Sequence, residues 1–502
     1  MTDCKSLADS KLTTAPVLYL PSDGPVPVAV SRLQQQCTVN VRRLPRIIHR
    51  EGEVRPEEIP VPGLLYLPNP YVVPGGRFNE MYGWDTYFIL LGEVLDGRLA
   101  LARGTVENFF YEIDHYGAIL NANRTYYLTR SQPPFLSSMV MLVYRGMREK
   151  DPQAATAFLR QALPYLERDH RLWTSAPHLA GDTGLSRYID LGRGPVPEMA
   201  DDSSYYIDVI HWLKAHPSEV NRTYLQPASG TPDSHCSHPG NCLRTEADGQ
   251  QLTESFFTGD RAMRESGFDT SFRFGPFSGS TENFAPVCLN SLLFRYEKDL
   301  AEIEAKLGHP QAAAHWKAVA RRRQGTMNRL LWDERAGMFF DYNVVMGQRS
   351  SYRFVTTYYT LWSGVASPAQ ARRMVAALPF FEQPGGLAMS DRHTGMQWDA
   401  PFGWAPTNWL AVAGLQGYGF DADARRLAGK FCATVERNYA MDGTIREKYN
   451  VESADANVAV AAGYKSNVIG FGWTNAVYAQ MQEMLSGKGR GVATATTSPS
   501  AH

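Results

Sequence analysis

Four carboxylates lie in irregular segments that also contain aromatic residues and glycine. They are Asp85 in PGGRFNEMYGWDTYF, Asp269 in ESGFDTSFRFGP, Asp399 in QWDAPFGWAP and Glu447 in REKYN. Hydrolysis of a glycosidic bond needs two such groups, one protonated to assist the leaving oxygen and one ionised to activate water or attack the sugar. The other two could hydrogen-bond sugar hydroxyls. Any single one of them could instead cap a helix or pair with an arginine.

Arginines in the same or similar loops could set the protonation states of these carboxylates. The candidates are Arg77, Arg130 and Arg273. A guanidinium lowers the pKa of a neighbouring carboxyl group, whereas apolar surroundings raise it. Spacing along the chain cannot show which distant loops meet. The residues taken alone therefore predict a candidate carbohydrate hydrolase and nothing more specific.

Helices must position these loops, because helical patterns dominate from about residue 85 onward. In NSLLFRYEKDLAEIEAKLG, apolar residues recur at helical spacing between a predicted N-cap at Asn290 and a predicted stop at Gly308. Asp151-Pro152 and Ser367-Pro368 open two further helices, and another begins near Asp421. The joins between helices are long and rich in glycine, proline and aromatic residues. This pattern indicates a helical scaffold that presents a site on its connecting loops.

Composition excludes several classes of function. The 502 residues carry 50 Lys and Arg against 51 Asp and Glu, and no basic stripe with interleaved aromatics indicates a nucleic-acid partner. No run of about eighteen apolar residues predicts a membrane helix. The start of the chain lacks an apolar secretory region, and six cysteines are thinly spread, which together predict a cytoplasmic protein. No glycine-rich phosphate fingerprint is present, and neither a cofactor nor a metal is expected.

The long segments identify a family. PGGRFNEMYGWDTYF and QWDAPFGWAP resemble the two signature segments of the trehalase family of glycoside hydrolases, family 37. LNANRTYYLTRSQPP resembles a third family segment, and ESGFD, REKYN and GFGWTN follow in the family's order. The resemblance spans about residues 60 to 485. It implies an all-α fold, the (α/α)6 barrel or toroid, with long loops that line the substrate site.

The resemblance also implies an inverting mechanism on an α-glucoside. The family's general acid corresponds to Asp269, and its general base corresponds to Glu447. The sugar contacts that carry over are Arg77, Phe78, Trp84, Asp85, Asn121, Arg130, Gln132, Glu198, Trp398 and Asp399. Phe78 and Trp398 could equally support the wall without touching the sugar. The expected activity is cleavage of trehalose, a small disaccharide, to two glucoses without a cofactor, by a monomer.

Several positions depart from the family's pattern. Val196 replaces an arginine that commonly reaches the substrate, and Arg193 lies close enough in sequence to substitute for it. Other departures are Phe268 for tryptophan before the acid, Cys288 for aspartate, and Gly463 in place of an acidic lid residue before Tyr464. These changes leave two alternatives open. One is the same mechanism on a different small α-glucoside, and the other is a non-catalytic sugar-binding protein. The presence of both Asp269 and Glu447 argues against the second alternative.

The chain divides into a short lead-in, one catalytic unit and a tail. We expect a lead-in over residues 1–40, a single barrel over 41–486 with an inserted loop at 213–260, and a flexible tail over 487–502. The insertion contains His235, Cys236, His238 and Cys242. An ordinary polar surface loop is the leading interpretation, a Cys236–Cys242 disulfide the second and a zinc site the third, because the spacing matches no standard zinc signature.

Overall fold

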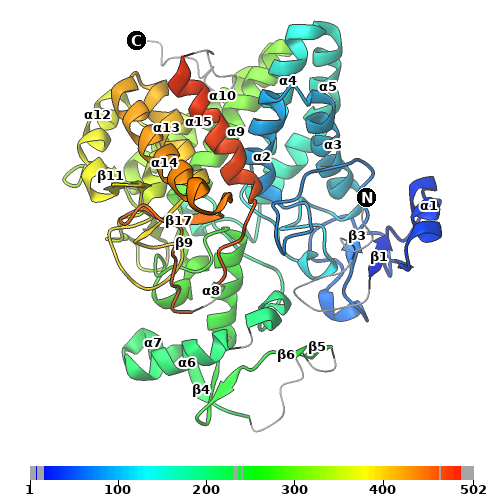
Figure 1. The fold of residues 1–502 in the computed structure, drawn as a ribbon, viewed down its shortest axis with the longest axis vertical. Coiled ribbons are helices and arrows are strands. Elements are labelled where there is room, and N and C mark those ends of the chain that lie inside the picture. The colour runs from blue at the N-terminus through cyan, green and yellow to red at the C-terminus, as the bar shows by residue number, and fades with distance from the viewer. Residues whose placement is uncertain are drawn as a thin grey trace.

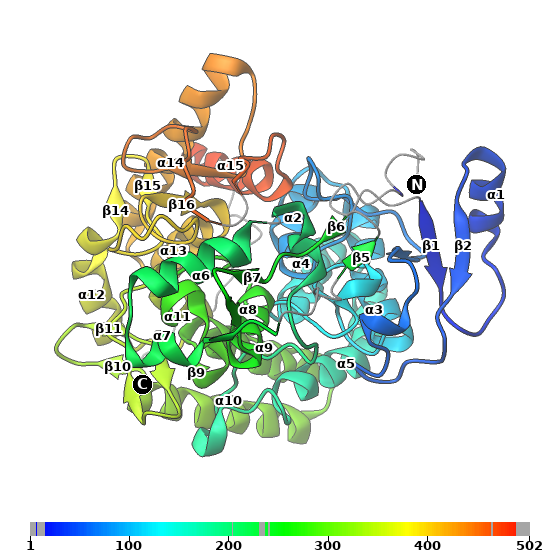
Figure 2. The same ribbon diagram turned by 90° about the horizontal axis from the view of Figure 1, so that it is seen from below.

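The structure is a computed structural model that describes Leu7 and residues 16–202, 204–229, 236–238, 241–462 and 465–487. Within these residues, six helices pack side by side and close a ring (Figures 1 and 2). In ring order they are α2 (Gly83–Leu95), α4 (Leu136–Lys150), α9 (Val287–Lys306), α11 (Tyr359–Ser363), α13 (Ala405–Gly417) and α15 (Gly472–Ser486). The contact between α15 and α2 closes the ring.

A second layer of helices covers this ring from outside. Its members are α3 (Leu99–His115), α5 (Pro152–Trp173), α10 (Pro310–Leu330), α12 (Pro368–Ala376) and α14 (Asp421–Asp442). The inner helices are buried on nearly all sides, as in α13, where Ala405–Leu415 are all buried, whereas α10 buries only a narrow stripe. Helices that are apolar all round belong in a core, and amphipathic ones belong on its surface. The predicted (α/α)6 barrel is confirmed.

Helix boundaries agree with the sequence signals in most places. Asp151 caps α5 by accepting hydrogen bonds from the amides of Gln153 and Ala154, and Ser367 forms a capping box with Gln370 at the start of α12. The predicted N-cap at Asn290 is wrong, because α9 begins at Val287 and the Asn290 side chain lies inside the helix.

Asn290 has a different task from capping. Its amide bonds the backbone carbonyls of Ser186 and Pro286, and Arg323 of α10 donates to its Oδ1 atom. The C-terminal signal of the same helix is confirmed, since Gly308 adopts a positive φ of 83° directly after the C-cap residue Leu307.

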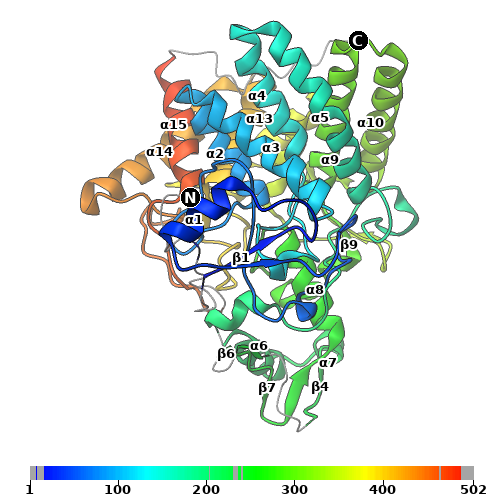
Figure 3. The same cartoon turned by 90° about the vertical axis from the view of Figure 1, so that its right-hand side faces the viewer.

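The lead-in and the residues that follow it, up to Leu65, form a small parallel sheet at the side of the barrel (Figure 3). Its order is β2 (Asn40–Arg43), β1 (Val17–Leu20), β3 (Leu64–Leu65), and α1 (Val28–Gln36) connects β1 to β2. Leu18, Leu20, Val30, Leu33 and Leu64 form the small core of this unit. Cys37, directly after α1, is disulfide-bonded, whereas Cys288 and Cys432 are buried free thiols.

The predicted insertion projects beyond the loop end of the barrel (Figures 1 and 3). It contains the end of α6 (Tyr205–Ala215), α7 (Glu219–Thr223) and the start of α8 (Glu254–Glu265), around an antiparallel sheet of β4 (Leu225–Pro227), β8 (Gln250–Leu252) and β7 (Glu246–Ala247). The backbones of β5 (Cys236–His238) and β6 (Asn241–Cys242) pair as a hairpin. His235 and the side chains of Cys236, His238 and Cys242 lie outside the described residues, as do Gly463, Tyr464 and residues 488–502.

Short paired strands connect the remaining loops. In one sheet β12 (Tyr342–Asn343) lies between β9 (Phe284–Ala285) and β13 (Gln348–Arg349). The other pairs are β10 (Trp332–Asp333) with β11 (Met338–Phe339), β14 (Glu382–Gln383) with β15 (Gly386–Leu387), and β16 (Phe402–Trp404) with β17 (Lys448–Asn450). Over the described part of the chain, no helix is both long and apolar enough to cross a membrane.

Candidate active site

A cavity lies where the connecting loops run into the N-terminal ends of the inner helices. All predicted site residues except Asp399 line it: Arg77, Phe78, Trp84, Asp85, Asn121, Arg130, Gln132, Glu198, Asp269, Trp398 and Glu447. The loops come from widely separated parts of the chain and precede α2, α4, α9, α13 and α15. Trp84 and Asp85, expected in an irregular segment, lie instead in the first turn of α2. The barrel therefore gathers at one end the loops in which the sequence places its unusual carboxylates, arginines and aromatic rings.

Asp269 is held just beyond the C-terminal end of α8. Gly267 makes the turn with a φ of 76°, and a Cβ atom there would lie 2.9 Å from the ring of Trp84. A side chain at this position is therefore excluded both by backbone conformation and by space. The side-chain amide of Gln397 donates to the carbonyl oxygen of Asp269, and the amide of Trp398 donates to Thr270 at 3.0 Å. The loop carrying Asp269 is thus fastened to the QWDAPFGWAP segment.

Glu447 directly precedes β17, which pairs with β16. Its amide donates to Val468 at 2.9 Å, and the indole of Trp473 donates to its carbonyl oxygen at 3.2 Å. The Lys448 ammonium donates to Glu447 Oε2 at 2.9 Å, and both side chains are buried. Burial lowers the pKa of Lys448, and the nearby Glu447 carboxylate opposes that shift.

The environment of Asp269 keeps a proton on its carboxyl group to a higher pH than an ordinary aspartate would. Burial raises the pKa of Asp269 to about 6, although the Arg264 and Arg130 guanidiniums act in the opposite direction. Arg264 Nη1 lies 3.5 Å from Asp269 Oδ2. Burial also holds the pKa of Asp85 well above its usual range, and the charges of Glu447 and Asp269 add to this effect. The cavity therefore combines a carboxyl group that can be protonated with a carboxylate paired to an ammonium.

Aromatic rings form one wall of the cavity. Trp398 stacks on Trp404 with ring centroids 3.8 Å apart and an interplanar angle of 6°. Trp84 packs edge-on against Phe268 and Trp473, and the three tryptophans Trp84, Trp398 and Trp404 are almost fully buried. Rings packed in this way form a rigid apolar surface, which suits the apolar face of a sugar ring.

A buried group of charged side chains complements this apolar wall. Arg130 forms an ion pair with Glu198 and lies 3.7 Å from Asp190 Oδ2, while its guanidinium sits 4.8 Å from the ring centre of Tyr127. The two carboxylates raise the pKa of Arg130 despite its burial. Arg130 therefore remains charged and can donate to an acceptor in the cavity.

Asp399 does not line the cavity, contrary to its predicted place among the sugar contacts. It is fully buried and accepts four hydrogen bonds, from the hydroxyls of Tyr352, Ser390 and Thr394 and from the amide of Phe272. Burial raises its pKa to about 6 even so. Its acceptor capacity is used inside the protein, so Asp399 holds together the loops behind the wall.

Val196 and Arg193 also lie away from the cavity lining. Val196 is fully buried in a cluster with Met199, Tyr205 and Tyr206, and its amide donates to the Tyr206 hydroxyl. Arg193 is exposed and does not line the cavity. It therefore does not take the place of the missing family arginine. Arg273, predicted to influence the site carboxylates, is buried in an ion pair with Asp341 instead.

Arg264 is the functional residue that the sequence did not reveal. It lines the cavity one turn before Asp269, pairs with Asp260 of the same helix at 3.1 Å, and sits over the ring of Tyr205. Its only signal in the sequence is its place directly before the ESGFD segment. The other lining residues that were not predicted are Tyr82, Tyr127, Met199, Gly267, Gln397, Trp404, Phe471 and Trp473. Gln397, Trp404 and Trp473 stand in the very segments that carry the family resemblance.

Comparisons with known proteins identify related sequences. A sequence model of the family described as Trehalase matches residues 27–486. A probable trehalase of Eremothecium gossypii is 36% identical over 525 residues, covering 94% of this chain and 68% of that protein. A cytosolic neutral trehalase of Beauveria bassiana is 38% identical over 466 residues, covering 84% and 59%. The chain thus spans about three fifths to two thirds of the length of these relatives.

A solved structure has the same fold. The neutral trehalase Nth1 of Saccharomyces cerevisiae superposes with a TM-score of 0.77 at 33% identity, and the match covers 99% of this chain and 92% of that one. The likeness therefore extends over the barrel, the lead-in and the site loops together.

Proposed function

The chain belongs to the trehalase family, and from this membership we propose that it is an inverting glycoside hydrolase that cleaves the α,α-1,1 bond of trehalose to two glucoses. The relatives are named trehalases, which supports trehalose as the substrate. The observation that carries the proposal is the pairing, in one cavity, of Asp269, with its raised pKa, and Glu447, which accepts a hydrogen bond from Lys448.

The proposed reaction takes place in one displacement. Asp269 donates its proton to the bridging oxygen as that bond to the anomeric carbon breaks. Glu447 removes a proton from a water molecule, whose oxygen attacks the anomeric carbon from the opposite face. The configuration inverts, so one glucose is released as the β-anomer and the other as the α-anomer. Proton exchange with solvent then returns Asp269 to its acid form and Glu447 to its carboxylate.

The other lining residues would bind and orient the sugars. Arg77, Arg130 and Asn121 offer donors to hydroxyl groups, and the buried Asp85, whose pKa lies well above its usual range, can donate as well as accept when it carries a proton. The Trp84 and Trp398 rings, which pack against each other at 5.9 Å, supply the apolar wall.

The test is glucose release from a panel of α-glucosides, followed by proton NMR during the first turnovers. We expect trehalose to be cleaved, with α- and β-glucose appearing in equal amounts before mutarotation. Formation of α-glucose alone would contradict inversion. Cleavage of another glucoside with trehalose left intact would support the second candidate, the same mechanism on a different substrate. Binding without cleavage of any panel member would favour a sugar-binding protein.

The second candidate is favoured by one observation in the site. Val196, where the family commonly has an arginine, is buried away from the cavity, while Arg264 reaches the cavity from α8. A cation that enters from a different element would meet a different part of the bound sugar, which could alter the preference between α-glucosides.

Arg264 also allows a prediction for the pH profile. The general acid works in its protonated form, so kcat/KM should fall as pH rises through the pKa of Asp269, about 6. Because Arg264 lowers that pKa, Arg264→Gln should shift the alkaline limb of the profile to higher pH, and Arg264→Lys should leave it close to that of the wild type. A limb that stays in place or moves to lower pH in Arg264→Gln would contradict the assignment.

Localisation and partners follow the relatives. Several relatives are named cytosolic neutral trehalases, which supports a cytosolic location for this protein. The monomeric state and the absence of a cofactor remain predictions.

A further inference from the structure

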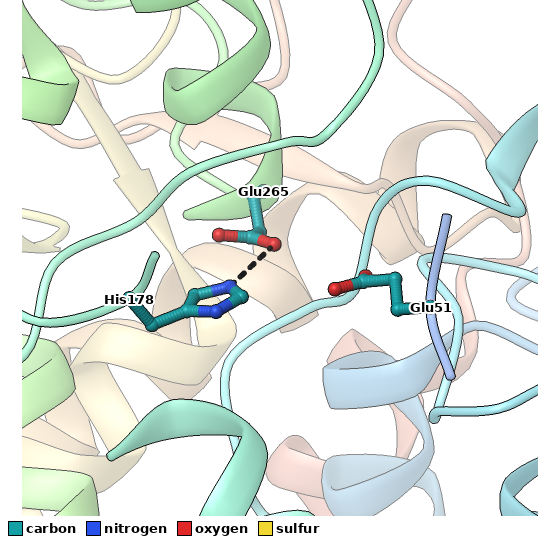
Figure 4. Close-up of side chains that lie close together, drawn as sticks. All are labelled: Glu51, His178 and Glu265. Carbon is teal, nitrogen blue, oxygen red and sulfur yellow. Dashed lines mark hydrogen bonds and ion pairs between the residues drawn. The ribbon is translucent and has the colours of Figure 1, made fainter. Parts of the chain in front are cut away.

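Three ionisable side chains meet in the interior, away from the residues that line the cavity. They are Glu51 from the loop after β2, His178 from the loop after α5, and Glu265 at the end of α8, with ligand atoms that all lie within 4.8 Å of one another (Figure 4). Glu51 is 5% exposed, and His178 and Glu265 are fully buried. Three distant segments of the chain thus converge on one buried point.

Among the described residues, Glu51 has no partner for its charge at this point. Within that part of the chain neither of its carboxylate oxygens has a hydrogen-bond partner, although the group points toward His178 and Glu265 in Figure 4. The neighbouring charges that act on it, Glu265, Asp190 and Asp169, are all acidic, and together with burial they hold the pKa of Glu51 well above its usual range. A buried carboxylate without a counter-charge is costly, so the site requires a cation or a proton.

The other two side chains lie at a separation that a shared ion would give, and Glu265 has the outer hydrogen bonds of a ligand, whereas His178 Nδ1 has no partner among the described residues. His178 Nε2 lies 3.4 Å from Glu265 Oε1. Two ligand atoms bound at about 2.0–2.1 Å to a tetrahedral ion lie about 3.4 Å apart. The amide of Ile189 donates to Glu265 Oε2 at 2.6 Å and the amide of Ser131 to Oε1 at 3.4 Å, so backbone groups orient this carboxylate. Such outer hydrogen bonds are typical of metal ligands.

We propose that Glu51, His178 and Glu265 bind a divalent metal ion, and that Zn²⁺ fits the set best. Two carboxylates would balance the charge of the ion, and one imidazole with two carboxylate oxygens is a donor set that Zn²⁺ accepts, with a water molecule as fourth ligand. Mg²⁺ and Ca²⁺ fit less well, because they prefer more oxygen ligands and no nitrogen.

The ion would have a structural task next to the cavity. Glu265 stands four residues before Asp269, and Ser131, which bonds Glu265, directly follows Arg130. Glu51 lies in the segment after β2, where the amide of Gly52 donates to Leu128 at 2.9 Å. The metal would therefore join this segment to the two loops that carry Arg130 and Asp269. The proposal does not depend on the identity of the substrate.

The test measures metal content and stability rather than turnover. The full chain without a histidine tag is stripped with a chelator, dialysed and titrated with Zn²⁺, with Mg²⁺ as a comparison, by calorimetry and elemental analysis. We expect about one tightly bound Zn²⁺ per chain and a melting temperature that rises by a few degrees at excess Zn²⁺. Glu51→Gln and His178→Gln should lose both effects.

Two control variants show whether the ion binds at this site or elsewhere in the chain. Glu93→Gln alters another buried carboxylate that lacks hydrogen-bond partners among the described residues, and it should bind Zn²⁺ as the wild type does. The double variant Cys236→Ser/Cys242→Ser removes the two cysteines among the possible competing ligands of the insertion, and it should also keep the ion. Absence of stoichiometric Zn²⁺ in the stripped and titrated wild type would overturn the proposal whether or not the variants fold. Unchanged binding in folded Glu51→Gln, or loss of binding in the cysteine variant alone, would overturn it as well.

Discussion

Asp269→Asn and Glu447→Gln each lower kcat on the cleaved glucoside by about a hundred- to ten-thousand-fold, the range found for loss of a general acid or base. The asparagine cannot donate a proton to the leaving oxygen, and the glutamine cannot take one from water. Both substitutions keep the size of the side chain, so substrate binding should change little. Steady-state kinetics, together with calorimetric titration of the inactive variants with trehalose, checks both parts of this expectation.

A matched control uses a carboxylate outside the site. Asp96 is exposed directly after α2, and Asp96→Asn should leave kcat and KM unchanged. If Asp269→Asn or Glu447→Gln retains turnover within a few-fold of the wild type, that residue is not the group assigned here. A folded variant is confirmed by an unchanged circular dichroism spectrum.

Arg273→Met should reduce the free energy of unfolding by about 3–5 kcal/mol, the usual cost of removing one partner from a buried ion pair. Arg273 donates to Asp341 through Nε at 2.7 Å and Nη2 at 2.6 Å, and both side chains are buried. Its guanidinium also lies 4.4 Å from the ring centre of Phe354. The substitution keeps an apolar stem but leaves the buried Asp341 carboxylate, among the described residues, with the Val287 amide at 2.8 Å as its remaining donor.

Urea denaturation of three variants distinguishes this cause from a simple packing defect. Arg273→Met/Asp341→Asn should recover part of the lost stability, because the stranded charge is gone. Arg168→Met, which removes one member of the exposed pair with Asp114, should cost no more than about 1 kcal/mol. A loss below about 1 kcal/mol in Arg273→Met, or no recovery in the double variant, would contradict the role given to this pair.

Much of the fold is determined locally and could be predicted. Asp151 and Ser367 begin their helices because a side-chain oxygen satisfies amides that the helix leaves free, and Gly308 ends one because it tolerates a positive φ. The predicted N-cap at Asn290 was wrong because an asparagine before an apolar run has the same pattern as a cap. Its hydrogen-bond partners Ser186 and Arg323 lie far away in sequence.

The sequence by itself determined which residue types are available for catalysis. Through the long signature segments it also predicted that Asp269 and Glu447 belong to one site, and the structure places both in the same cavity. The sequence could not separate Trp398, which lines the cavity, from its neighbour Asp399, which is fully buried behind the wall. Nor could it show that Arg264 faces Asp269 or that Glu51, His178 and Glu265 converge. These facts depend on which loops the closed ring of helices brings together, and burial, which sets the pKa values of the site, exists only once that ring has formed.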